Sequence, residues 1–351
     1  MQDVQNRAFP QGILTSLHDV HFVCPLCRGE LRVKRTGYDC ELCEREFPLH
    51  AGIPDFRVFP DPFLNFQEDF DRTEIVLAGL EKYELEDLLK YYWSFSDITP
   101  LALRPKFIRA VMMGEERARH TVDMFNNGTF KIDIAARRVL EIGSGTGNFL
   151  AAAAGKYDRI IGTDIAMRWL HVSRRRFRDK GLPEPALVCC CAEFLPFADK
   201  NFDLVTSTST LEFVNDQQKV LSECSRVISD LGSVHISSVN RYSLAKDPYA
   251  HLWGVGFFPY AWQACYVRWR RNAAYKSRTL SYRRLKNLIH SDFTYFETAL
   301  PDINSSTLSK LSPLMRFQVH MYRFLKTLPF FAFIFRQFGP GWEMILRKKP
   351  L

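Results

Sequence analysis

The stretch that decides the fold is residues 139–149, VLEIGSGTGNF. Its first four residues, apolar except for Glu141, are typical of a buried β-strand, and a helical pattern begins at Asn148. The glycines between them, Gly143, Gly145 and Gly147, let the backbone approach a ligand where a side chain would clash. The helix start offers unpaired N–H groups to an anion. A dinucleotide-binding GxGxxG would place its third glycine at position 148, so this GxGxG spacing disfavours NAD.

An acidic residue, Asp164, ends the next apolar run, residues 159–163, and lies 21 residues after Gly143. A carboxylate at this place can accept hydrogen bonds from both hydroxyls of a ribose. Taken alone, the glycines could form a purely structural turn, and Asp164 could be an ordinary surface residue. The order strand, glycine turn, helix, strand and acid predicts a nucleoside-binding site.

Apolar runs and helical stretches alternate over the rest of this region, which predicts a parallel sheet covered on both faces. The predicted strands are residues 139–142, 159–163, 186–190, 202–207 and 234–239, with a helix at 217–229 before the last one. Residues 303–338 have a helical pattern, and residues 342–347 are expected to form a final edge strand. Before the sheet, helical periodicity predicts helices at 81–90 and 105–125.

Two CxxC pairs near the start of the chain, Cys24 with Cys27 and Cys40 with Cys43, have the spacing of a tetrahedral zinc site. Four protein ligands leave no open position, so such a zinc would be structural. A module of this size cannot be stabilised by burial alone, which is a reason for a metal. The alternative is four reduced thiols in a loop.

Three motifs in order, LEIGSGTGNFL (140–150), IIGTDIAMRWL (160–170) and AEFLPFADKNFDLVTSTSTLEFV (192–214), resemble the class I methyltransferases of the UbiE/Methyltransf_11 type. The resemblance covers about residues 110–240. It implies S-adenosylmethionine as the cofactor and an α/β fold with a Rossmann-like seven-stranded sheet.

Carried over by position, the resemblance assigns residues to each part of the cofactor. Glu141 and the three glycines would hold the methionine end, and Asp164 the ribose. Ala192 and Glu193 would lie at the adenine, and Ile165 and Thr208 would complete the site. The family commonly has Asp before the Ala-Glu pair, where this chain has Cys191. Glu193 or a backbone carbonyl would then contact the adenine amino group.

Residues 22–56 resemble Trm112-like zinc ribbons, and a ribbon fused before such a domain is similar to bacterial large-subunit rRNA guanine methyltransferases. Those enzymes commonly complete their zinc site with His, where this chain has Cys43. The expected organisation is a zinc ribbon with an N-terminal lead-in (1–58), a helical linker or cap (59–130), and a methyltransferase domain (131–351) with an aromatic insertion at 240–290.

The chemistry would need few side chains, because a sulfonium methyl is already activated and the enzyme has only to align the acceptor and exclude water. A base is needed only for a protonated acceptor. Candidates for it are His235, Tyr242 and His251, and further polar residues expected to face the cofactor are Thr208, Glu212, Asn240 and Tyr249. Each of these side chains could equally have a structural role.

The distribution of charge along the chain is relevant to the class of methyl acceptor. The chain has 47 Lys+Arg and 39 Asp+Glu, a net charge of +8, with basic clusters at 168–180 and 268–286. These clusters could attract nucleic acid, anionic lipid or a phosphorylated substrate, or be solvated helix faces.

Three functions remain open. The aromatic insertion and the apolar, basic segment 322–336 favour a small-molecule, lipid or glycolipid acceptor, and this segment could lie on a membrane surface or pack on the sheet. The zinc ribbon and the basic, aromatic residues 262–286 would suit RNA. The third function is a non-catalytic binding protein.

Cysteine usage and the chain start predict the compartment. Paired CxxC units and three consecutive cysteines in an apolar run indicate metal binding and buried thiols rather than disulfides, hence a reducing, cytoplasmic environment. The first twenty residues lack the pattern of a signal peptide, and the apolar run 328–335 is too short to span a bilayer. Contact with a membrane surface stays open.

Overall fold

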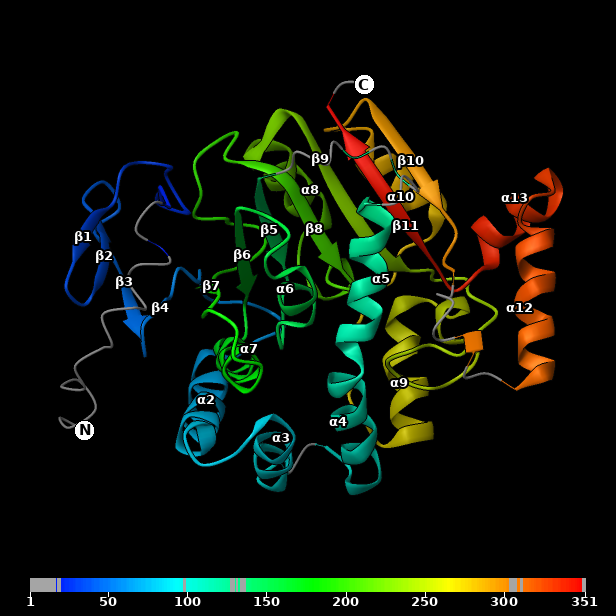
Figure 1. Cartoon of the computed structure of the whole chain (residues 1–351), viewed down its shortest axis with the longest axis horizontal. Helices are drawn as coiled ribbons and strands as arrows, with labels where there is room; N and C mark the ends of the chain where they lie inside the picture. Colours follow the sequence, from blue (N-terminus) through cyan, green and yellow to red (C-terminus); the bar gives the residue numbers. More distant parts are fainter. Residues whose placement is uncertain are drawn as a thin grey trace.

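The computed structural model describes residues 17, 20–96, 99–126, 130, 132, 137–302, 308–309 and 312–348. It contains a small four-stranded sheet at one end of the molecule and a seven-stranded sheet in the middle, with helices on both sides (Figure 1). The expected α/β class, with a seven-stranded sheet and a small N-terminal cysteine-rich module, is confirmed.

The large sheet has the order β10-β11-β9-β8-β5-β6-β7. Its strands are β5 (Arg138–Ile142), β6 (Arg159–Asp164), β7 (Ala186–Cys189), β8 (Phe202–Thr208), β9 (Ile228–Val239), β10 (Tyr295–Ala299) and β11 (Gly341–Arg347). Strands β5 to β9 pair in parallel, and β11 is antiparallel to both β9 and β10. The five strands predicted from apolar runs are all present, and β9 begins six residues earlier than predicted.

The final strand is not at the sheet edge, so that expectation was wrong. Strand β11 lies between β9 and β10, and Trp342, Met344 and Leu346 on it are buried. A strand covered on both faces is apolar throughout, as this one nearly is. The edge position belongs to β10, a half-buried strand that the sequence analysis did not predict.

The helices that connect the parallel strands are α6 (Asn148–Ala153), α7 (Met167–Asp179) and α8 (Gln217–Val227). Those before the sheet are α2 (Phe66–Leu80), α3 (Leu85–Ser94), α4 (Arg104–Met112) and α5 (Gly114–Asn126), with a short 3-10 turn η1 (Leu101–Leu103). The helix expected at 81–90 begins only at Leu85, because residues 81–84 form the turn after α2. The helix expected at 105–125 is divided at Met113.

Helix α7 carries the basic cluster 168–180, and its arginines are not a free surface. Arg168, Arg174 and Arg176 are buried. Arg168 pairs with Asp69 of α2, Arg174 pairs with Glu184, and Arg176 Nε donates to the carbonyl of Thr146 (2.8 Å). Neither expectation for this cluster, a ligand-attracting patch or a solvated helix face, describes these three side chains. Buried guanidinium groups instead tie α7 to the elements packed around it.

The small sheet consists of β1 (Arg32–Lys34), β2 (Gly37–Cys40), β3 (Arg45–His50) and β4 (Ile53–Pro54), all antiparallel. It shares its core with the large domain, because the rings of Phe22 and Phe197 lie 5.7 Å apart and the Phe56 N–H donates to the Cys189 carbonyl (2.8 Å). The chain leaving the ribbon therefore covers the end of β7.

The C-terminal third adds helices to the side away from the ribbon (Figure 1). These are α9 (Tyr260–Arg271), α10 (Tyr282–Ile289), α12 (Pro313–Leu325) and α13 (Pro329–Phe338), with short 3-10 turns η2 (Leu211–Phe213) and η3 (Val255–Phe257) elsewhere. Of the expected helical stretch 303–338, residues 303–307 and 310–311 lie outside the described residues. Within the described part of the chain, no helix has the length and apolar character needed to cross a bilayer.

Candidate functional site

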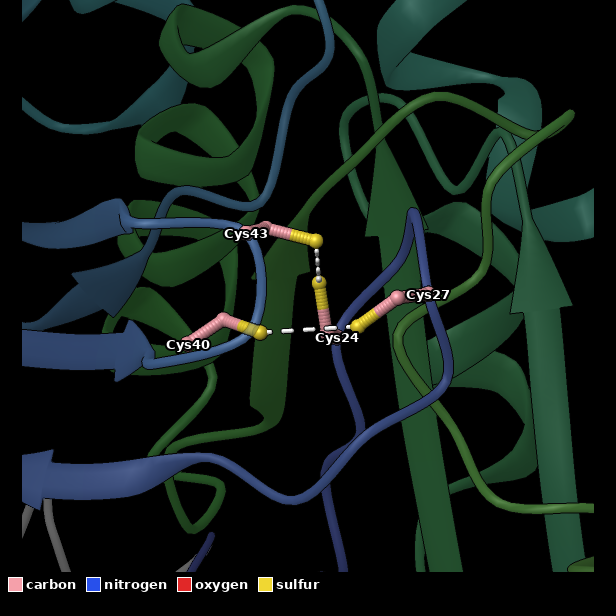
Figure 2. Close-up of side chains that lie close together, drawn as sticks. All are labelled: Cys24, Cys27, Cys40 and Cys43. Atoms are coloured by element: carbon pink, nitrogen blue, oxygen red, sulfur yellow. Dashed lines mark hydrogen bonds between the residues drawn. The ribbon is translucent and has the colours of Figure 1, made fainter.

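The four CxxC cysteines come together on two neighbouring turns of the ribbon (Figure 2). Their sulfurs all lie within 4.8 Å of one another, with Cys24 and Cys43 at 3.9 Å and Cys27 and Cys40 at 3.5 Å. A tetrahedral zinc with Zn–S bonds of about 2.3 Å requires sulfur separations of roughly 3.8 Å. The four thiols can therefore hold one metal ion without rearrangement of the backbone.

One of these thiols is prepared for deprotonation. The backbone N–H of Gly29 donates to Cys27 Sγ at 3.4 Å and, with the neighbouring thiols, lowers the pKa of Cys27 to about 7. Metal ligation needs thiolates, so this contact favours the ligating form. All nine cysteines lie in the described residues, and none of them forms a disulfide.

The glycine turn follows β5 as predicted, and all three glycines have positive φ (73°, 49° and 73° at positions 143, 145 and 147). A Cβ on Gly143 would lie 2.1 Å from Thr210 Oγ1, and one on Gly147 would lie 2.0 Å from Ser173 Oγ. A Cβ on Gly145 would meet no protein atom within 4 Å. Gly143 and Gly147 are thus required for packing, whereas the face of Gly145 is open for a ligand.

Asp164 at the end of β6 holds this turn. Its Oδ2 accepts the N–H of Gly145 (2.9 Å), and its Oδ1 accepts the N–H of Ala166 (2.8 Å). Burial raises the pKa of Asp164, and these two N–H groups oppose that effect. The carboxylate is therefore oriented by the backbone next to the open glycine.

Glu141 is the last acidic residue of β5 and is buried. Its Oε2 has no hydrogen-bond partner among the described residues. Burial raises the pKa of Glu141 well above its ordinary value, and the nearby charge of Asp164 adds to this effect. A buried carboxylate oxygen without a partner is costly, so a ligand group that donates to it would relieve the cost.

A cavity of about 920 Å³ lies over the glycine turn, at the carboxyl ends of β5 and β8. Its floor comes from the turn and these strands, and its walls come from α3, α4 and α5 and from Trp169. The wall residues include Trp93, Phe107, Val111, Arg117, His120 and Thr121. The cavity is thus polar at the floor, and its walls combine aromatic and apolar side chains with a few polar ones.

The structure brings part of the predicted cofactor site to this cavity. Glu141, Gly143, Gly145 and Thr208 line it. Asp164 reaches it through Gly145, and Gly147 caps α6 beside it.

Three further predicted cofactor residues, Ile165, Ala192 and Glu193, are also absent from the cavity lining. The carbonyl of Ile165 accepts from Arg57 Nη1 (3.2 Å). Glu193 is buried and accepts the N–H of Asn215 (2.7 Å). Ala192 is half-buried against the core. Cys191, where the family commonly has Asp, lies 3.5 Å from the backbone of Val58, which leaves the ribbon.

None of the three base candidates lines the cavity. His235 is fully buried in β9, where Nδ1 lies 2.9 Å from Thr206 Oγ1 and Nε2 lies 2.7 Å from Glu343 Oε2. Tyr242 packs against Phe257 in the insertion, and His251 is exposed on a turn.

Of the other four polar candidates, three make contacts elsewhere in the structure and one lines the cavity. Glu212 is buried and accepts from Ser238 Oγ and the N–H of Val239. The Asn240 amide donates to the carbonyls of Gln337 and Gly339. Tyr249 stacks edge-on against Phe213. Only Thr208 lines the cavity.

The cavity also contains titratable groups that the sequence did not indicate, among them Glu343 and His120. Glu343 is the single acid in the buried strand β11, opposite Ser237 of β9. A carboxylate inside an apolar strand could have marked it. His120 lies on α5 one turn after Arg117 and on the same face, and its Nε2 has no partner among the described residues.

Comparisons with known proteins agree with this geometry. Residues 140–236 match the family described as a methyltransferase domain. The ubiquinone/menaquinone biosynthesis C-methyltransferase UbiE of Paraburkholderia xenovorans is 36% identical over 124 residues, 34% of this chain and 49% of that protein. The corresponding protein of Burkholderia cenocepacia is 38% identical over 114 residues, 32% of this chain and 45% of that protein. The chain therefore spans about half the length of these curated relatives.

A solved S-adenosylmethionine-dependent methyltransferase from Thermotoga maritima is 19% identical, with a TM-score of 0.44, covering 70% of this chain and 95% of its own. The family match and the UbiE relatives identify residues 140–236 as a methyltransferase domain. The predicted resemblance of this part of the chain to the UbiE/Methyltransf_11 methyltransferases is thereby confirmed.

Proposed function

We propose that the chain is a methyltransferase that transfers a methyl group from S-adenosylmethionine to a small-molecule or lipid-like acceptor. The observation that carries the proposal is the pairing of the open glycine, Gly145, with the oriented carboxylate of Asp164 at the floor of the large cavity. We also propose the division into a ribbon (1–58), a helical cap (59–130) and a methyltransferase domain (131–351). Helices α3 to α5, which lie in the middle segment, supply walls above the cavity floor.

The residues present fit the cofactor. The Glu141 Oε2 without a partner can accept from its amino group, and the N–H groups at the start of α6 can bind its carboxylate. Asp164 can accept from the ribose hydroxyls, as the predicted assignment requires. Bound S-adenosylmethionine supplies an electrophilic methyl group on a sulfonium. A Cβ at position 145 would occupy space that the cofactor needs.

The chain's own contribution is to position the acceptor and keep water away. Trp93, Phe107 and Phe149 give the cavity apolar walls. Glu343 faces the cavity while its Oε2 is held by His235 and its Oε1 accepts from Ser237 Oγ (3.0 Å). This carboxylate can take a proton from an acceptor that must lose one. His235 would then act behind Glu343 rather than on the acceptor.

The cavity walls and the relatives support the proposed acceptor class. The UbiE relatives are C-methyltransferases of ubiquinone and menaquinone biosynthesis, and an aromatic, apolar wall suits an acceptor of small, hydrophobic type. Structural zinc at the four cysteines is part of the proposal, supported by the sulfur separations. RNA is the second candidate, favoured by the exposed Arg268, Arg270 and Arg271 of α9.

The test is methyl transfer into fractionated extract. Purified protein with methyl-labelled S-adenosylmethionine is incubated with lipid, aqueous small-molecule and RNA fractions of a cell that contains the protein. Label should enter the lipid or small-molecule fraction with the wild type and a Gly155→Ala control, and not with Gly145→Ala. Label confined to RNA would favour the second candidate, and failure to bind S-adenosylmethionine would contradict the proposal.

A further inference from the structure

Helix α12 is apolar on the side that faces away from the protein. Leu314, Phe317, Met321 and Phe324 follow one another at helical spacing and are all exposed, Phe317 to 60% and Phe324 to 65%. Residues three, four and seven positions apart share one helix face. This row is therefore a continuous apolar stripe in contact with solvent.

The opposite side of α12 is half-buried against the protein and carries both charged and apolar side chains. Arg323 Nε donates to Asp302 Oδ1 (2.9 Å), Lys326 pairs with the other oxygen of Asp302, and Tyr322 donates to the carbonyl of Pro301 (2.8 Å). A surface helix of a globular protein normally has its apolar side inward. Simple packing on the sheet does not explain the exposed apolar stripe of this helix.

Helix α13 follows α12, packs against it through the rings of Tyr322 and Phe335 (5.1 Å apart), and also has exposed rings. Phe330 is exposed to 69%, and Phe333 is also exposed. The helix end is held in place, because the Asn240 amide donates to the carbonyls of Gln337 and Gly339, and Trp342 Nε1 donates to the carbonyl of Arg336 (2.8 Å). The exposed rings thus belong to a docked element with defined contacts.

The segments that form this surface carry cations and no acids, and Asp302 before α12 pairs with two of the cations. Residues 312–342 contain four Lys or Arg and no Asp or Glu, and residues 248–291 contain eight and none. The second segment includes α9, where Trp262 and Trp269 are exposed on one face beside Arg268 and Arg270. Helix α9 lies toward the same end of the molecule as α12 and α13 (Figure 1). Apolar and aromatic side chains among cations match the chemistry of an anionic lipid surface.

We propose that α12, α13 and the exposed face of α9 form a docking surface for an anionic lipid bilayer. These helices have 13, 10 and 12 residues, too few to cross a bilayer, so the protein would lie on the surface with its aromatic rings at the headgroup level. A second copy of the chain is disfavoured as the occupant, because two such surfaces would bring like charges together.

The docking surface is connected to the large cavity. Asp302, which holds Arg323 and Lys326 of α12, is also one of the residues that line the cavity. Docking would therefore bring the cavity close to the lipid, from which a hydrophobic acceptor could enter. This last step rests on the proposed function, whereas the docking itself does not.

The test uses the full chain and vesicles of phosphatidylcholine alone or with phosphatidylglycerol. Co-sedimentation should be strong with the anionic vesicles and decrease with salt. The double variant Phe317→Glu/Phe330→Glu should weaken it about tenfold or more, because it removes apolar contact and adds negative charge. The matched control Val33→Glu/Leu231→Glu changes exposed residues of β1 and β9 and should bind as the wild type does.

Several results would overturn the docking proposal. These are equal binding of both double variants, no binding to anionic vesicles, and a concentration-dependent dimer or RNA complex that Phe317→Glu/Phe330→Glu disrupts while vesicles are not bound. Binding of S-adenosylmethionine, measured by calorimetry on the same samples, separates the two proposals. Vesicle binding without cofactor binding would sustain the docking surface and reject the methyltransferase.

Discussion

Gly145 donates its backbone N–H to the carboxylate of Asp164 at 2.9 Å, so the turn after β5 and the end of β6 form one unit. The contact places the open face of the glycine beside a fixed acid. It also joins the two features that the sequence analysis could only place in order along the chain. The first two predictions follow from it.

Gly145→Ala should remove cofactor binding with only a modest loss of stability. A positive φ costs an alanine about 1–2 kcal/mol, and the added Cβ meets no protein atom but enters the cavity. Gly155 has φ of 73° and equally open surroundings outside the cavity, so Gly155→Ala is the matched control. Calorimetry should show binding only for the control, while thermal unfolding should change similarly in both. Equal cofactor binding would reject the cavity as the cofactor site.

Asp164→Asn should weaken the binding of S-adenosylmethionine by about 1.5–3 kcal/mol, the usual contribution of a hydrogen bond to a charged group. The amide retains the shape of the carboxylate but loses its charge and one acceptor. Binding is measured by titration calorimetry, with Asp158→Asn, an exposed acid before β6, as the comparison. An unchanged dissociation constant for Asp164→Asn would show that the ribose assignment is wrong.

Glu141→Gln should stabilise the free protein near pH 7.5 by about 1–3 kcal/mol, because a buried carboxylate that lacks a partner for Oε2 is replaced by a neutral group. The raised pKa of Glu141 means that folding penalises its charged form. The gain should therefore be complete above the raised pKa and disappear as the pH falls below the ordinary value of 4.5.

Urea unfolding of the wild type and Glu141→Gln at several pH values measures this gain. The same variant should bind S-adenosylmethionine about tenfold more weakly, since its amino group loses a charged acceptor. A variant that is less stable than the wild type at pH 7.5 would mean that the carboxylate is satisfied in the free protein.

Cys43→Ser should abolish stoichiometric zinc and lower the melting temperature. Structural zinc sites supply folding energy directly, and a ribbon of this size depends on it. Elemental analysis should find one zinc per chain in the wild type and none in the variant. Cys265→Ser changes an exposed cysteine of α9 and should retain the metal. A metal-free wild type with the same melting temperature as the variant would contradict structural zinc.

Removal of the ribbon metal should also destabilise strand β7 of the large sheet. Phe56 is fully buried and its N–H donates to the end of β7, so unfolding of the ribbon would expose the strand that it covers. Hydrogen exchange of residues 186–189 should therefore increase in Cys43→Ser. Protection equal to that of the wild type would show that the two sheets are stabilised independently.

The local features of the site could be predicted from the sequence because their chemistry depends on short spacings. The positive φ angles at 143, 145 and 147, the acid at the end of β6, and the cysteine quartet all arise from residues near one another in the chain or from paired motifs. The alternation of apolar runs likewise determined the parallel core, since strands buried on both faces must be apolar.

Only the tertiary structure decided which distant residues meet. Glu343 of β11 and His120 of α5 reach the same cavity from elements far apart in the chain, and no local pattern relates them. Arg168 and Arg174 of α7 are buried and paired with Asp69 and Glu184 of other segments, although in the sequence the cluster resembles a solvated basic face. The position of β11 inside the sheet depends on pairing with β10. These pairings join segments that are far apart in the chain. The burial of each segment depends on its partner, so the sequence of one segment alone does not reveal it.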